Sequence, residues 1–208
     1  PTVIVLHSTG GNPERVAELS NLNAYADQFG FQVAYPAAVE RAWNDGRPDS
    51  PGRKDVDDVG FVAALAGHLV DTFNADPARL FLVGLAEGGM MAQRVACDHA
   101  RLFAGIATVN GSLPAAVASR CRPAAPMPIL MIHGTSDPFV PFRGGMSTHV
   151  GQPAGEVLSA FDNAEAWRRS NGCIGETTVK RFPDVAMNDG SRVISHRWNG
   201  CRTHADVL

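Results

Sequence analysis

An apolar, strand-like segment runs into a glycine-rich turn at Leu80–Met91, and this turn has the form that presents a catalytic nucleophile. Gly84 and Gly88 lie two residues on either side of Ala86, in the pattern G-x-A-x-G. A nucleophile in such a turn has a strained backbone, and its neighbours two positions away must be small so that strand and helix can approach each other. Alanine stands where this pattern carries its serine. The sequence therefore predicts the scaffold for nucleophilic chemistry without the attacking oxygen.

An acidic residue follows another apolar strand in the segment His133–Phe142, HGTSDPFVPF. In α/β-hydrolases the acid of the Ser, Asp, His triad follows the nucleophile in chain order and lies on a loop at the carboxyl end of a later strand. Asp137 satisfies both conditions, and we predict that it is the triad acid. The alternative interpretation is an Asx-type turn before Pro138.

A third segment, His7–Gly11 or HSTGG, closes the first strand. A loop at this place normally donates one N–H to the oxyanion hole, and the residue after the nucleophile donates the other. We therefore expect the backbone N–H groups of Glu87 and Thr9 to form the hole, with Ser8 as the alternative to Thr9.

These residues must be positioned by a sheet, because short apolar strands alternate with helical patterns along most of the chain. That alternation indicates a mostly parallel sheet covered on both faces, the α/β class of the α/β-hydrolases. Helix starts are marked by Asn12 before Pro13 and by Asp57 and Asp58. The expected strands are Thr2–Leu6, Gln32–Tyr35, Leu80–Val83, Phe103–Val109 and Pro128–His133, and the expected helices run from Pro13 to about Phe29, from about Val59 to Phe73 and from about Gly88 to His99.

The pattern changes after residue 144. We expect a helix near Gly155–Asn171 and then two alternating strands, Thr177–Phe182 and Arg192–Trp198, with hairpin-type residues Asn188–Gly190 between them. We interpret about residues 144–200 as a helix-plus-hairpin excursion before the last strand. Residues 1–208 are then a single domain.

Composition excludes several classes of function. The 208 residues are 45% hydrophobic and 19% charged, which suffices for a sizeable core. A formal net charge of −3 with no basic stripe argues against nucleic-acid binding, and no apolar stretch approaches the roughly 20 residues of a membrane span. The acids of Asp55–Asp58 are explained by a capped helix start and have no histidine beside them, so we predict no metal and no other cofactor.

The four cysteines contain no C-x-x-C pair, which removes support for a zinc or redox motif. Cys173 and Cys201 each follow Asn-Gly and flank the two late strands, so we expect a disulfide between them, with two ordinary thiols as the alternative. Cys97 with Cys121 is a second candidate pair.

Six strings occur in one order over nearly the whole chain: VIVLHSTGG, AWNDGR, DVDDVGFV, VGLAEGGMMAQRVAC, IHGTSDPFVPF and WNGC. Together they resemble the secreted esterases of the polyhydroxybutyrate depolymerase and feruloyl esterase type. The resemblance implies an α/β-hydrolase that cleaves carboxylic esters, either hydroxyalkanoate polymers or feruloyl and acetyl groups of plant polysaccharides, outside the cytoplasm in a secreted or periplasmic location. It places Ala86 at the nucleophile position, Asp137 as the acid, and Glu87 and Thr9 as oxyanion donors. It also places Trp43 and Asn44 in a loop that borders the cleft, and the alternative for these two residues is a packed aromatic beside an Asn turn.

The chain departs from this family in three places. Ala86 replaces the nucleophilic serine, and Ser8 stands where members usually have glycine. Members carry the catalytic histidine in a glycine-rich loop after one more strand, and this chain stops at Leu208 as that strand would begin. We therefore assign none of its seven histidines to the triad. We also expect the chain to be truncated at both ends. Two function classes remain: an esterase that is inactive as written, and a non-catalytic ligand-binding descendant of one.

Overall fold

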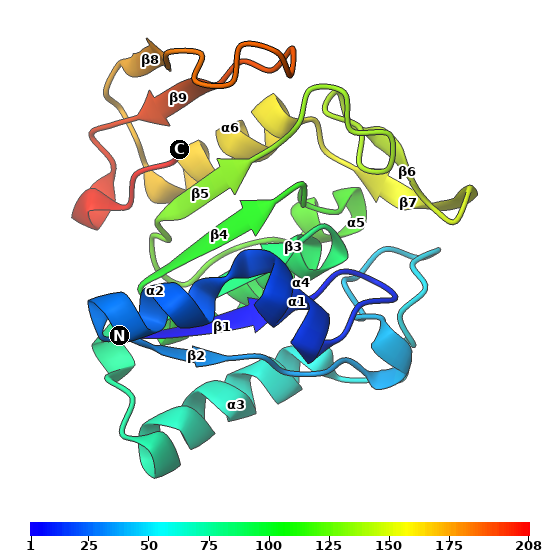
Figure 1. The fold of residues 1–208 in the computed structure, drawn as a ribbon, viewed down its shortest axis with the longest axis vertical. Helices are drawn as coiled ribbons and strands as arrows, with labels where there is room; N and C mark the ends of the chain where they lie inside the picture. Colours follow the sequence, from blue (N-terminus) through cyan, green and yellow to red (C-terminus); the bar gives the residue numbers. More distant parts are fainter.

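A parallel sheet of five strands forms the centre of the molecule. The computed structural model describes the backbone of residues 1–208 and every side chain except that of His204. The strands are β1 (Thr2–Leu6), β2 (Gln32–Ala34), β3 (Leu80–Leu85), β4 (Gly105–Val109) and β5 (Ile129–Ile132), in the order β2-β1-β3-β4-β5. Every neighbouring pair runs parallel, which confirms the predicted fold class (Figure 1).

The central strands are continuous apolar runs because they are covered by other parts of the protein. Ile4 and Leu6 of β1 and Leu82 of β3 are fully buried. A strand that is covered on both faces has no polar face to alternate with, so its sequence reads as an unbroken run of Val, Ile and Leu.

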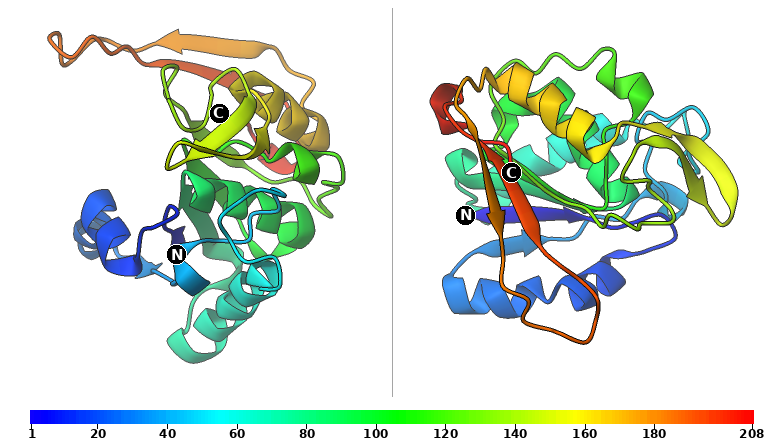
Figure 2. Two further views of the ribbon diagram at one scale, coloured as in Figure 1. Left: turned by 90° about the vertical axis from the view of Figure 1, so that its right-hand side faces the viewer. Right: turned by 90° about the horizontal axis from the view of Figure 1, so that it is seen from above.

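Helices lie on both faces of the sheet, as Figure 2 shows. On one face are α1 (Pro13–Ser20) and α2 (Leu22–Phe29), and on the other are α3 (Asp58–Phe73) and α4 (Glu87–His99). The prediction of one helix from Pro13 to Phe29 was wrong at its middle. Asn21 has a φ of 51°, a left-handed conformation that ends α1 and starts α2, and Asn is among the few residues that adopt it readily.

The segment after β5 holds an element that the sequence analysis missed. Strands β6 (Gly145–His149) and β7 (Gln152–Val157) form an antiparallel hairpin, so the prediction of helix from Gly155 was wrong. Gly155 has a φ of 95°, which a helix cannot contain, and α6 (Ala160–Asn171) begins only after Ser159, whose side chain accepts the Asp162 N–H. In Figure 1 the hairpin lies beyond the carboxyl ends of the parallel strands.

The last part of the chain returns to the sheet. Strands β8 (Thr177–Arg181) and β9 (Ile194–Trp198) pair antiparallel, as predicted. Val207 then bridges Trp198 of β9 and Ile129 of β5, the latter in parallel register. The remaining short elements are η1 (Val39–Arg41), η2 (Pro77–Arg79), η3 (Ala100–Leu102), α5 (Ala115–Ala118) and η4 (Arg202–His204).

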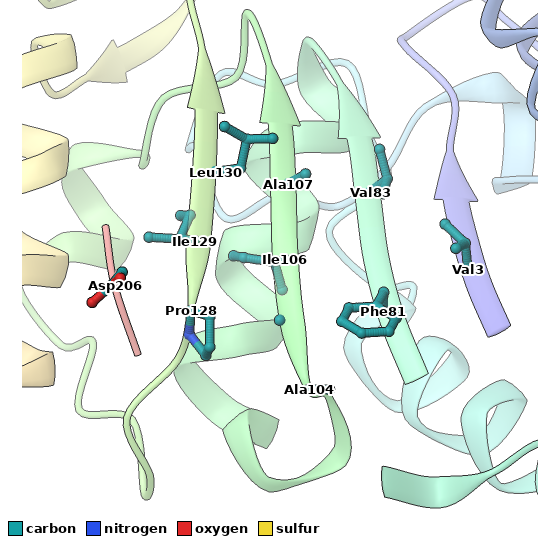
Figure 3. Close-up of a pocket in the computed structure, with 11 residues that line it drawn as sticks. Val3, Phe81, Val83, Ala104, Ile106, Ala107, Pro128, Ile129, Leu130 and Asp206 are labelled. Carbon is teal, nitrogen blue, oxygen red and sulfur yellow. The ribbon is translucent and has the colours of Figure 1, made fainter. Parts of the chain in front are cut away.

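One face of β3, β4 and β5 forms an open hollow of about 430 Å³ (Figure 3). Its lining is almost entirely apolar and includes Phe81, Val83, Ile106 and Leu130, with Asp206 at its rim. Its lining includes neither the elbow nor any residue of the loops that carry the predicted chemistry.

Both predicted cysteine pairs are formed. Cys173–Cys201 joins the end of α6 to the loop after β9, and Cys97–Cys121 joins α4 to the loop after α5. In the part of the chain that the structure describes, no helix has the length and apolar character needed to cross a membrane.

Candidate active site

The turn between β3 and α4 has the strained geometry of a nucleophile elbow. Ala86 has φ 50° and ψ −116°, a conformation that costs a non-glycine residue about 1–3 kcal/mol. The glycines around it are required by close packing, since a Cβ on Gly84 would overlap the backbone of Gly88, and a Cβ on Gly88 would overlap the carbonyl of Leu6. The methyl of Ala86 therefore occupies the place where such a turn presents its reactive atom.

The first strand ends in a loop that is held by a buried histidine. His7 is 1% exposed, and its Nε2 accepts the Ala38 N–H at 3.1 Å while its Nδ1 lies 2.8 Å from the Ser8 carbonyl. The same carbonyl accepts the Gly11 N–H at 2.9 Å, which closes the turn around Thr9. His7 thus stabilises the loop.

Glu87 meets this loop through its side chain. Its Oε2 accepts the backbone N–H of Thr9 at 3.2 Å, and Thr9 is the residue predicted to supply the second oxyanion donor. Glu87 is buried at the start of α4, and its Oε1 lies 4.0 Å from Nδ1 of His149. The backbone donor predicted at Thr9 is therefore at the elbow, but its hydrogen is directed to a carboxylate of the same chain.

Trp43 and Asn44, predicted to border the cleft, are instead packed into the protein. Trp43 is buried and donates from Nε1 to the His7 carbonyl at 2.9 Å. Asn44 is buried too, and its Nδ2 donates to the Val56 carbonyl at 2.9 Å. The alternative interpretation, a packed aromatic beside an Asn turn, describes both residues, because their polar atoms are used to hold the loop.

The acidic segment before α3 is likewise structural. Asp57 accepts the Gly60 N–H at 2.9 Å and caps the helix. Asp58 accepts the Asn44 N–H at 2.7 Å, and burial raises the pKa of its carboxyl. Among the described residues no group of three or more His, Cys, Asp and Glu is placed to hold a metal ion.

Asp137 lies on the loop after β5, at the same end of the sheet as the elbow. The ends of the strands are linked there, since Ala86 N–H donates to the Val109 carbonyl at 2.8 Å and Asn110 Oδ1 accepts the Gly134 N–H at 3.0 Å. Oδ1 of Asp137 accepts the N–H groups of the second and third residues after it, at 2.8 and 2.9 Å. The Asx-type turn therefore exists, and it uses Oδ1 of the carboxylate.

The missed hairpin β6–β7 adds a histidine to this end of the sheet. It is anchored by a buried ion pair in which Arg47 Nη2 contacts Asp45 Oδ2 at 2.6 Å, and by Arg47 Nη1, which donates to Ser147 Oγ at 2.6 Å. Ser147 Oγ in turn donates to the Gly155 carbonyl across the hairpin. The anchor fixes the hairpin so that His149 faces Glu87.

Comparison with known proteins agrees with this geometry. The family model described as "Esterase PHB depolymerase" matches residues 1–177. "Putative esterase NocK" of Nocardia uniformis subsp. tsuyamanensis is 34% identical over 227 residues, which cover 96% of this chain and 66% of that protein. "Feruloyl esterase B" of Piromyces equi is 33% identical over 183 residues, which cover 85% of this chain but only 33% of that protein.

Among solved structures, the acetyl xylan esterase from Aspergillus awamori superposes on this chain with a TM-score of 0.61 and 15% sequence identity. The match covers 86% of this chain and 73% of the esterase, and it shows a similar fold. The chain thus spans about two thirds of the first relative and one third of the second. The chain has the elbow of this family and matches its model over most of its length, and it belongs to the esterase PHB depolymerase family.

Proposed function

We propose that this chain belongs to a carboxylic ester hydrolase in which Ala86 has replaced the nucleophilic serine, so that the chain as it stands binds esters without cleaving them. The observation that carries the proposal is the backbone of Ala86, which keeps the strained elbow conformation although it presents only a methyl group. Removing a triad nucleophile costs about six orders of magnitude in turnover where this has been dissected.

In this proposal Asp137 is the triad acid, and the backbone N–H groups of Glu87 and Thr9 are the oxyanion donors. The proposed substrate is an ester of the kind that the relatives' names indicate, since the matching family is described as "Esterase PHB depolymerase" and one relative as "Feruloyl esterase B". Two disulfides suit an oxidising compartment, which supports a secreted or periplasmic location.

The test is to restore the hydroxyl with Ala86→Ser and to measure release of p-nitrophenolate from p-nitrophenyl acetate. We expect the unchanged protein to match the buffer rate and Ala86→Ser to exceed it only slowly, because none of the histidines is assigned as the base that would activate the introduced hydroxyl. Ala37→Ser is the matched control, because it adds a hydroxyl at an exposed loop position after β2. Equal rates for the two serine variants would contradict the proposal.

A second candidate function is that of a ligand-binding descendant that has abandoned catalysis. It is favoured by one observation, the Glu87 carboxylate that engages the Thr9 N–H. Under this alternative Ala86→Ser stays inactive, while the unchanged protein and the variant bind a neutral ester with equal affinity.

A further inference from the structure

The Glu87 side chain has no assigned part in ester hydrolysis, yet it is the charged group nearest in sequence to the nucleophile position. It is 7% exposed. Burying a carboxylate is costly unless it is paired or hydrogen-bonded. Oε2 of Glu87 accepts the Thr9 N–H at 3.2 Å, and Nδ1 of His149 lies 4.0 Å from Oε1.

Three segments of the chain meet at this carboxylate. Thr9 lies on the loop after β1, Glu87 on the first turn of α4, and His149 at the end of β6. The N-terminus of α4 favours a negative charge in its first turn, and a hydrogen bond to an ionised acceptor is stronger than one between neutral groups. The carboxylate therefore ties the loop after β1 to the start of α4, and His149 lies beside it.

The contact has a direct chemical consequence. A backbone N–H has a single hydrogen, so the Thr9 amide cannot bind Glu87 and a ligand oxyanion fully at the same time. The carboxylate also places a negative charge beside the Thr9 N–H, the proposed oxyanion donor, and like charges repel each other. One oxyanion donor contributes on the order of 10²–10³ in rate, so the occupation of Thr9 matters for anything that binds there.

We propose that Glu87 is a specificity-determining residue: its carboxylate occupies the Thr9 N–H in the unliganded site and makes the site prefer a neutral ester over the carboxylate anion that hydrolysis releases. This inference rests on the proposed function for the identity of Thr9 as an oxyanion donor. A neutral ester carbonyl meets no charge repulsion as it approaches the elbow. A carboxylate product faces Glu87 and leaves.

The anchor of the hairpin supports this assignment. His149 would not be held near Glu87 if the hairpin were free, but Ser147, two residues away on the same strand, is fully buried and bound to Arg47. The position of the second partner of Glu87 is therefore set by a rigid contact, which is the condition for a preorganised site.

The experiment uses the 208-residue protein and three variants. Glu87→Gln keeps the shape and a hydrogen-bond acceptor but removes the charge, Glu87→Ala removes both, and Glu156→Gln is the control because Glu156 is an exposed carboxylate on β7. The ligands are methyl ferulate and ferulate, a neutral ester and its carboxylate. Amide resonances are recorded without ligand, and both dissociation constants are measured by titration.

We expect the Thr9 amide resonance to move in Glu87→Ala without any ligand. We expect the ratio of the ferulate Kd to the methyl ferulate Kd to fall at least tenfold in both Glu87 variants and to stay unchanged in Glu156→Gln. An unmoved Thr9 resonance, or an unchanged ratio in both Glu87 variants, would overturn the inference. If none of the four proteins binds either ligand, both the proposed function and the proposed preference for a neutral ester fail. The Thr9 resonance still shows in that case whether Glu87 binds the Thr9 amide.

Discussion

Arg47→Met should destabilise the protein by about 3–5 kcal/mol, because it leaves a buried carboxylate without its partner. Arg47 and Asp45 are 1% and 0% exposed. Asp45 accepts from Arg47 Nε at 3.1 Å on both of its oxygens and from Nη2 at 2.6 Å, and only the Arg47 backbone N–H at 3.0 Å would remain. Ser147 would also lose the guanidinium that donates to its hydroxyl.

The loss is large relative to the whole stability of a domain, which is about 5–15 kcal/mol. With a urea m-value of about 2 kcal/mol per molar, the unfolding midpoint should fall by about 1.5–2.5 M. Circular dichroism during urea titration measures it.

The matched control is the double variant Asp45→Leu with Arg47→Met, which removes both charges and replaces them with apolar side chains. Replacing a whole buried ion pair is often close to neutral, so the double variant should be more stable than Arg47→Met alone, with a coupling energy of at least about 2 kcal/mol. A loss below about 1 kcal/mol for the single variant, or additive losses in the double variant, would refute the idea that pairing holds this carboxylate in the interior.

Two further predictions concern the elbow and the surface of α6. Gly84→Ala should cost more than about 4 kcal/mol or prevent folding, because its Cβ would overlap the Gly88 backbone. Gly67 is an exposed position of α3 with no atom within 4 Å of an added Cβ, so Gly67→Ala should stabilise the protein by about 0.5–1 kcal/mol. Thermal unfolding compares the two variants, and similar shifts for both would contradict the packing argument. Hydrogen bonding to Arg168 and Arg169 lowers the pKa of the Glu165 carboxyl from 4.5 to about 2. The ionised carboxylate should therefore stabilise the protein by about 0.5–1 kcal/mol above pH 4.5, and this contribution is lost as the pH falls toward 2. The difference in urea midpoint between the unchanged protein and Glu165→Gln should shrink over that range, and a constant difference would show that the charge of Glu165 is not its source.

The strands and the elbow could be predicted from sequence because several local signals agree there. Thr2–Leu6 and Leu80–Val83 are unbroken apolar runs, and the glycines after the second run have no other local explanation than a tight turn. The disulfide Cys173–Cys201 was predicted because both cysteines flank the late strands, which pair with each other in the structure. A segment can be predicted from sequence when its local pattern and its place in the fold agree in this way.

The hairpin β6–β7 could not be predicted because its signals conflict. Its alternation is broken by a register shift between Met146 and Thr148, and the glycines at 144, 145, 151 and 155 all have positive φ, which weakens any strand pattern. Its docking depends on Arg47, about 100 residues earlier in the chain. The contact of Glu87 with Thr9 and His149 was missed for the same reason, since it joins residues that are far apart in sequence and meet only in the folded chain.

The retained strain at Ala86 is explained by packing around the elbow. Its N–H donates to the Val109 carbonyl and its own carbonyl accepts the Met90 N–H, while a Cβ on Gly111 would lie 2.6 Å from that same carbonyl. These contacts fix the backbone from both sides, and none of them involves a hydroxyl at position 86. The fold therefore maintains the elbow backbone whether or not a nucleophile is present. Ala86→Ser is therefore expected to present a hydroxyl from an unchanged elbow, and the slow reaction of that variant would reflect the missing base rather than a lost scaffold.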